Sequence, residues 1–103
     1  MLVYTAATYL YNISKNLYMN IGILKAISDD TRFKMLRMLE DGELCVCYFP
    51  SRLDVSQSAI SQHLKILLVA GLVAVREDGT KRLYSLSKKG RMVLNDVLGW
   101  QSS

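Results

Sequence analysis

The sequence is poor in several residue types, and each shortage limits what the chain can be. It has a single proline and no low-complexity tract, so nothing in its 103 residues suggests a linker between two domains. It has one histidine and no Cys-x-x-Cys spacing, paired carboxylates or Ser/His/Asp arrangement, which leaves no pattern typical of an enzyme. We therefore expect one domain without catalytic activity.

Long apolar runs are also missing. Residues 1–24 start apolar, but asparagine, serine and lysine interrupt them, so this stretch is too polar to span a bilayer. It also lacks the basic start and the small-residue cleavage site of a signal peptide. These features predict a cytoplasmic protein with no membrane contact, in which both cysteines are reduced thiols. A shorter product that starts at Met19 would lose most of this stretch.

Acidic residues are outnumbered by basic ones. The chain has 13 Lys and Arg against 9 Asp and Glu, a formal net charge of +4, so a homodimer would carry +8 (2 × 4). This charge suits an anionic partner such as DNA, although a merely basic soluble protein has the same balance. Half of the residues are hydrophobic, which is enough for a core, and several apolar faces suggest that part of the burial is between subunits.

The stretch from Val55 to Gly71 contains no acidic residue, which is unusual for a surface helix. Ser56 is a natural N-cap, and Gly71 is a natural stop. At a helical period the apolar face holds Ile60, Leu64, Leu67 and Leu68, and the opposite face holds Gln57, Ser58, Ser61, Gln62 and Lys65. Amide and hydroxyl groups can both donate to and accept from base edges in the major groove, whereas a lysine suits a phosphate. The stretch therefore favours a DNA recognition helix, with an ordinary amphipathic core helix as the alternative.

The residues before this helix predict further helices and a tight turn. Ile23–Ile27 is a short apolar helix, and Ser28–Arg32 caps the next one, which ends at Gly42. Proline disfavours helix at the residue before it but fits a first turn, which predicts a short helix over Pro50–Leu53 after an irregular segment. A turn over residues 53–56 then leads into the recognition helix. Two helices joined in this way form a helix-turn-helix.

After Gly71 the hydrophobic period changes from that of a helix to that of a strand. Leu72–Val75 predicts one strand, Glu77–Thr80 a turn in which Asp-Gly supplies the positive-φ positions, and Lys81–Leu86 the returning strand. The hairpin tip is basic, with Arg76, Lys81 and Arg82. Directly after a recognition helix, such a hairpin is a wing that contacts phosphates or an adjacent minor groove. A solvated turn is the alternative. The predicted fold class is mainly α with a β-hairpin wing, a winged helix-turn-helix.

Apolar residues near the N-terminus recur at the spacing of a helix that packs on a partner helix. We expect a homodimer formed by this helix (residues 1–20) and a C-terminal helix (88–103), on either side of a DNA-binding core (21–87). The N-terminal helix could instead pack on its own domain. The predicted dimerisation residues are Val3, Leu10, Ile13, Leu17, Val93, Val97 and Trp100.

Four segments, taken in order, carry a family resemblance: Ser28–Arg32, Glu43–Cys47, Val55–Leu64 and Tyr84–Leu86. Together they resemble the ArsR/SmtB family of metal- and metalloid-responsive winged-helix repressors. The segment Glu-Leu-Cys-Val-Cys is typical of the arsenic/antimony and cadmium/lead sensors of that family. The resemblance implies a homodimer that binds a pseudo-palindromic DNA operator and leaves it when an inducer binds.

Cys45 and Cys47 are the candidate metal ligands. Thiols at i and i+2 lie about 200° apart on a regular helix and cannot hold one ion there, but they share one side of an extended or unwound segment. Ion binding would therefore select an altered backbone just ahead of the recognition helix. A disulfide across one intervening residue would be strained, so we expect two thiols.

The choice of inducer follows from the resemblance and from two departures. Arsenic sensors of this type often have a third cysteine where this chain has Pro50, and residues 1–20 lack the cysteines that cadmium/lead sensors use. The family analogy places His63 in packing at the base of the recognition helix. Two thiolates fit trivalent As(III) or Sb(III) better than tetrahedral zinc or cadmium. Cd(II), Pb(II) or no metal are the alternatives, and DNA binding itself needs no cofactor.

Two other functions remain open. The first keeps the winged helix but makes the thiols a redox switch. The second is a small thiol oxidoreductase or metal carrier, against which the missing Cys-x-x-Cys and the missing base beside the thiols argue.

Overall fold

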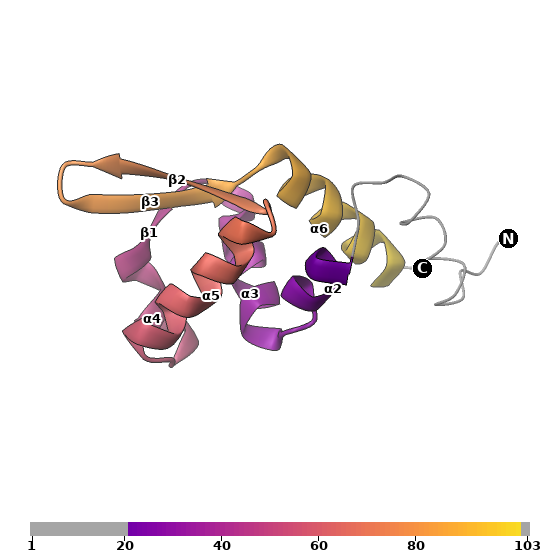
Figure 1. Ribbon diagram of the computed structural model, residues 1–103, viewed down its shortest axis with the longest axis horizontal. Helices are drawn as coiled ribbons and strands as arrows, with labels where there is room; N and C mark the ends of the chain where they lie inside the picture. Colours follow the sequence, from indigo (N-terminus) through magenta and orange to yellow (C-terminus); the bar gives the residue numbers. More distant parts are fainter. Residues whose placement is uncertain (1–20, 102–103) are drawn as a thin grey trace, which may run out of the picture.

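The computed structural model describes residues 21–101, and its elements follow the predicted order (Figure 1). The helices are α2 (Ile21–Ile27), α3 (Asp30–Met38), α4 (Phe49–Leu53), α5 (Gln57–Val69) and α6 (Lys88–Gln101). Two 3-10 turns, η1 (Leu39–Asp41) and η2 (Val46–Tyr48), and the strands β1 (Leu44–Cys45), β2 (Val73–Asp78) and β3 (Lys81–Leu86) complete the order. The predicted class, mainly α with a β-hairpin, is confirmed. The predicted N-terminal helix lies outside the described residues.

The helix-turn-helix consists of α4, a short turn and α5. Asp54 ends α4 in the left-handed conformation, with φ 53° and ψ 46°. Asp and Asn tolerate this conformation better than most residues, because their short polar side chains can hydrogen-bond locally. Ser56 then caps α5, since its hydroxyl accepts a hydrogen bond from the Ala59 amide at 3.2 Å. The predicted cap is confirmed.

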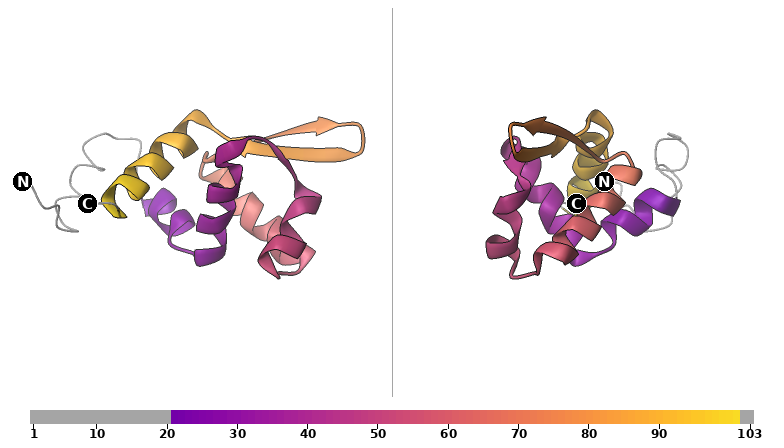
Figure 2. Two further views of the ribbon diagram at one scale, coloured as in Figure 1. Left: turned by 180° about the vertical axis from the view of Figure 1, so that it is seen from behind. Right: turned by 60° about the vertical axis from the view of Figure 1, so that its left-hand side comes forward.

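The three strands form one antiparallel sheet in the order β1-β3-β2. The β2–β3 pairing runs from Val73 opposite Leu86 to Asp78 opposite Lys81, so β2 is longer than predicted and the turn has only two residues, Gly79 and Thr80. Of the expected Asp-Gly pair, only Gly79 has a positive φ, of 63°. Glycine at the first position of a two-residue turn suits the twist of the flanking strands. The hairpin projects beyond the helices in Figure 1 and in the left view of Figure 2.

The hydrophobic core lies where α2, α3, α5 and α6 meet the base of the sheet. Its largest fully buried side chains include Phe49 from α4, Met35 and Leu36 from α3, and Ile60 and Leu64 from α5. Each such side chain contributes roughly 1.5–3 kcal/mol when it leaves water. No buried polar or charged residue occurs among the described residues. The core therefore holds α5 by one face only and leaves its other face free.

Gly90 determines how closely α6 approaches the rest of the fold. A Cβ at this position would lie 1.9 Å from the backbone carbonyl oxygen of Leu72. No side chain fits at that distance, so the first turn of α6 can pack against the chain entering β2 only because residue 90 is glycine.

Candidate nucleic-acid interface and thiol pair

The recognition helix presents the face that its sequence predicts. All five polar residues of that face are exposed, and Ile60, Leu64 and Leu67 are buried on the other side. Leu68 departs from the prediction, because it remains 37% exposed. It lies at the edge of the apolar face, where the core no longer covers it. The exposed polar residues are Gln57, Ser58, Ser61, Gln62 and Lys65.

The three basic residues of the wing differ in whether a carboxylate already binds them. Arg76 donates two hydrogen bonds to the Glu43 carboxylate, both of 2.7 Å, which raises the pKa of the arginine and lowers that of the glutamate. Lys81 and Arg82 are exposed near the turn, and the Arg82 guanidinium lies 5.8 Å from the Tyr84 ring centre. The predicted tip cluster therefore has two available cations, while Arg76 is already paired.

The two cysteines lie on the segment that joins α3 to the helix-turn-helix. Cys45 ends β1 with an extended backbone (φ −67°, ψ 142°), and its sulfur accepts a hydrogen bond from the Cys47 amide at 3.3 Å. The segment is not a regular helix, so the sulfur atoms can face each other. The Cα atoms are 5.2 Å apart, and the structure joins the sulfurs in a disulfide. The prediction of two free thiols is thus wrong for this structure, because the extended backbone at Cys45 brings the sulfurs to one side.

The thiol segment is also tied to the wing, which the sequence analysis missed. β1 pairs with β3, with Leu44 opposite Tyr84 and Cys45 opposite Leu83. The 3-10 turn η2, which contains Cys47, packs against both β3 and α5. A two-residue strand is too short to show an alternating pattern, so only the third-strand pairing itself reveals it. The Glu43–Arg76 ion pair also joins the residue just before β1 to strand β2.

No further metal ligand joins the cysteines. Within residues 21–101 the structure contains no group of three or more His, Cys, Asp or Glu side chains that could hold a metal ion. His63 instead contacts Arg32, whose Nη1 lies 3.1 Å from the ring Nδ1. The prediction that the histidine packs at the base of the recognition helix agrees with its partly buried position.

The predicted dimerisation residues fall into three groups. Val93 is fully buried in the core of the single chain, so we assign it to that core and not to a subunit interface. Val97 is half-buried, and Met92, elsewhere on the same helix, is 42% exposed. The other predicted residues, Val3, Leu10, Ile13, Leu17 and the side chain of Trp100, lie outside the described residues.

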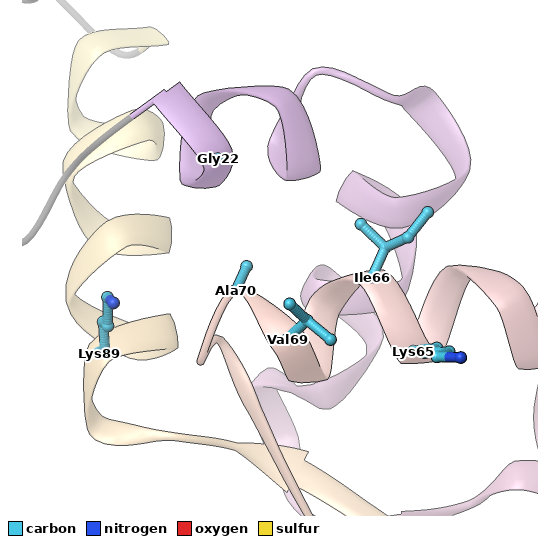
Figure 3. Close-up of a pocket in the computed structure, with 6 residues that line it drawn as sticks. All are labelled: Gly22, Lys65, Ile66, Val69, Ala70 and Lys89. Atoms are coloured by element: carbon cyan, nitrogen blue, oxygen red, sulfur yellow. The ribbon is translucent and has the colours of Figure 1, made fainter.

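A shallow hollow of about 430 Å³ lies between the end of α5, the start of α2 and the start of α6 (Figure 3). Ile66 and Val69 project from α5 along its wall, and Val69 is 81% exposed. Lys65 and Lys89 lie at opposite sides of the view, and Gly22 and Ala70 complete the lining. The hollow is mainly apolar and lies at the opposite end of α5 from Gln57 and Ser58.

Among residues 21–101, no helix has the length and apolar character needed to span a bilayer.

Comparison with known proteins identifies the family of this fold. Residues 29–75, from the cap of α3 into β2, match the family described as "Bacterial regulatory protein, arsR family". An ArsR protein of Halobacterium salinarum, named for the arsenical resistance operon, is 46% identical over 77 residues. That alignment covers 73% of this chain and 60% of the relative. The arsenical resistance operon repressor of Staphylococcus aureus is 38% identical over 76 residues, which cover 74% of this chain and 70% of the relative.

The solved structures agree with this assignment. HlyU of Vibrio cholerae superposes with a TM-score of 0.71 at 34% sequence identity, covering 89% of this chain and 97% of HlyU. HlyU is named a transcriptional activator, and it is 42% identical over 78 residues, which are 76% of this chain and 72% of HlyU. These relatives are transcriptional regulators. The chain belongs to the ArsR family of winged-helix regulatory proteins.

Proposed function

We propose that this chain is a homodimeric transcriptional repressor that binds operator DNA and releases it when As(III) or Sb(III) binds Cys45 and Cys47. The observation that carries the proposal is the place of the thiol pair in the fold. It is paired with the wing strand β3 through β1 and packs against α5 through η2. A change of backbone at the pair would therefore act on both elements that contact DNA.

In this proposal polar residues of the recognition helix read the base sequence, and basic residues of that helix and of the wing contact phosphates. The amides and hydroxyls of α5 read base edges from Gln57, Ser58, Ser61 and Gln62, all of which are exposed. Lys65, Lys81 and Arg82 contact phosphates, which adds affinity without sequence preference. Arg76 contributes less than these three, because Glu43 already neutralises it. A dimer would place its two recognition helices about 34–36 Å apart on a pseudo-palindrome.

The chemistry of the thiol pair supports a metalloid inducer. Once reduced, two thiolates on one side of an unwound segment can chelate one soft ion. A trivalent metalloid needs one more ligand, which hydroxide or a small thiol from solution can supply. Tetrahedral Cd(II) would need further protein ligands, and the described residues place no group of three or more His, Cys, Asp or Glu side chains that could supply them. The names of two relatives, which refer to arsenical resistance, point the same way.

Dimerisation is proposed through residues 1–20 and the C-terminal helix 88–103, around a DNA-binding core of residues 21–87. The exposed Met92 and the half-buried Val97 on α6 support an interface on that helix. A single chain of this size also has only a modest core, and burial between subunits would add to its stability.

The disulfide favours a second candidate, a thiol-redox switch on the same winged helix. The structure joins Cys45 to Cys47, so oxidation and metalloid binding would use the same two sulfurs. Oxidation by a mild thiol oxidant would then release DNA without any metalloid, and a reductant would restore binding. The two candidates differ in what releases the DNA, which is a metalloid in the first and a thiol oxidant in the second.

The deciding experiment is fluorescence anisotropy of labelled DNA from the chain's own promoter region. The protein is kept reduced with a phosphine, because dithiol reductants bind arsenite themselves. We expect tight binding that micromolar arsenite or antimonite abolishes. Tight binding that resists both metalloids but, once the phosphine has been removed, responds to diamide would leave the redox switch. No binding to any promoter fragment at low salt would overturn the repressor altogether.

A further inference from the structure

Arg32 is partly buried on α3, and its side chain connects three helices. Its Nε donates to the Ala26 carbonyl at 2.7 Å, and its Nη2 donates to the Lys25 carbonyl at 3.2 Å. Both carbonyls belong to the last turn of α2, where helix carbonyls have no partner within the helix. The remaining amine, Nη1, reaches His63 on the recognition helix at 3.1 Å. One side chain thus joins the end of α2 to α5.

The direction of the Arg32–His63 hydrogen bond follows from the chemistry of the two groups. A guanidinium has only donors, so Nδ1 of His63 must be the acceptor. The ring is then neutral and carries its proton on Nε2. Because Arg32 is itself held by two backbone carbonyls, it can fix the imidazole, and with it the turn of α5 that carries Ser61 and Gln62.

The carboxylate of Asp29 lies close enough to His63 to replace Arg32 as its partner. Asp29 Oδ2 lies 3.9 Å from Nδ1 of His63, and it accepts the Arg32 amide at 3.0 Å as the cap of α3. Protonation would make Nδ1 a donor, which Arg32 repels and Asp29 attracts. From the neighbouring α4, Arg52 donates instead to Tyr48. The position of the imidazole ring therefore depends on whether it hydrogen-bonds to Arg32 or to Asp29.

We propose that Arg32 is a positioning residue for DNA recognition, which acts through neutral His63 to orient the recognition helix. This inference rests on the proposed DNA binding. It implies that DNA affinity falls on acidification, as His63 exchanges Arg32 for Asp29. His63 is the only histidine of the chain, so a change between about pH 7.5 and 5.5 points to this ring.

Two isosteric variants separate this role from a general packing role. His63→Asn places an amide oxygen near Nδ1 and can still accept from Arg32, whereas His63→Gln places its amide near Nε2. Asn and His have similar helix propensities, and Gln has a slightly better one. We expect His63→Gln to bind operator about tenfold more weakly at pH 7.5, and His63→Asn to bind within about threefold of wild type. Arg37→Gln changes an exposed arginine of α3, the helix that carries Arg32, and as the control should bind as wild type.

The pH profile is the second readout. Wild-type affinity should fall about fivefold or more between pH 7.5 and 5.5, and His63→Asn should be flat over this range. Equal effects of the two His63 variants, with an unchanged pH profile, would overturn the inference while leaving DNA binding intact. Loss of wild-type binding at every pH would instead be a failure of the proposed function.

A measurement on the wild-type protein avoids any folding problem of the variants. Long-range proton–nitrogen NMR correlation of the imidazole distinguishes its tautomers directly. We expect the Nε2–H form at pH 7.5, with Nδ1 as an acceptor. A spectrum of the Nδ1–H form would exclude the hydrogen bond from Arg32 and thereby the inference.

Discussion

The recognition helix and the thiol segment stand side by side in the fold, yet different forces shape them. Helix α5 has its own cap at Ser56, its own apolar face and 13 residues of regular structure. The segment from Leu44 to Tyr48 has only a two-residue strand and one 3-10 turn. Its shape depends on β3, on Arg76 and on the link between its own cysteines. The first element is stabilised locally, and the second is held by its neighbours.

This difference suits the two proposed roles. A base-reading surface must keep its geometry, because misplaced amides lose their partners in the groove. A sensing segment must instead have a second backbone arrangement of similar free energy, so that a ligand can select it. A short segment held by a few outside contacts meets that requirement better than a capped helix does. The predictions below test this contrast, from the largest effect to the smallest.

Removal of both thiols should abolish sensing and spare DNA binding. In Cys45→Ser/Cys47→Ser, we expect operator affinity within about twofold of wild type, because neither cysteine lies on the reading face of α5. The metalloid response, which we expect to be about 5- to 150-fold in wild type, should disappear. Anisotropy titrations of operator with and without arsenite measure both. Continued release of the double variant by arsenite would remove these cysteines from the mechanism.

Substitution on the recognition helix should weaken DNA sequence preference and leave the arsenite response unchanged. Gln62→Ala removes a side chain proposed to read bases, so we expect the ratio of operator to non-specific affinity to fall by about 1–3 kcal/mol. The arsenite response should persist. Competition titrations against unrelated DNA give the ratio.

Arg82→Ala on the wing is the matched control for Gln62→Ala. It should weaken binding to all sequences alike and reduce the salt dependence by about one charge per protomer. If both variants lost only operator preference, the division between reading by α5 and phosphate contact by the wing would be wrong.

The sequence predicted the recognition helix well and the thiol segment poorly, for the same physical reason. The period of Ile60, Leu64 and Leu67 and the cap at Ser56 are local signals, and both were confirmed. The β1–β3 pairing and the Glu43–Arg76 ion pair join residues 33 or more positions apart, and no local pattern records them. The disulfide was not expected, because a bond across one intervening residue was judged too strained. The extended backbone at Cys45, which the β1–β3 pairing sustains, nevertheless brings the two sulfurs together. Arg32 was recognised only as part of a capping motif, since its carbonyl and histidine partners come from two other helices.

Loss of the helix cap should destabilise the recognition helix more than any change to the thiol segment does. Ser56→Ala leaves the Ala59 amide without its side-chain partner, which should cost about 1 kcal/mol of unfolding free energy. Urea unfolding followed by circular dichroism measures this loss. Ser51→Ala, an exposed serine of α4, is the control and should change stability by less than about 0.5 kcal/mol. Equal losses in the two variants would contradict a locally stabilised α5.

The weakest expected effect lies where the thiol segment meets the wing. Glu43→Gln breaks the ion pair with Arg76, but both side chains are exposed, so water screens most of their attraction and little stability should be lost. The pKa of Glu43 is lowered by its hydrogen bonds from Arg76, so whatever stability the pair adds is present at neutral pH and is lost on acidification through the carboxylate range.

In Glu43→Gln, the freed Arg76 should also add a phosphate contact, which would raise DNA affinity slightly and steepen its salt dependence. The arsenite response should need less metalloid, because one outside contact of the sensing segment is gone. A variant with unchanged salt dependence and an unchanged arsenite midpoint would show that this corner of the molecule does not restrain the segment, and that β1 and η2 alone connect the cysteines to the wing and to α5.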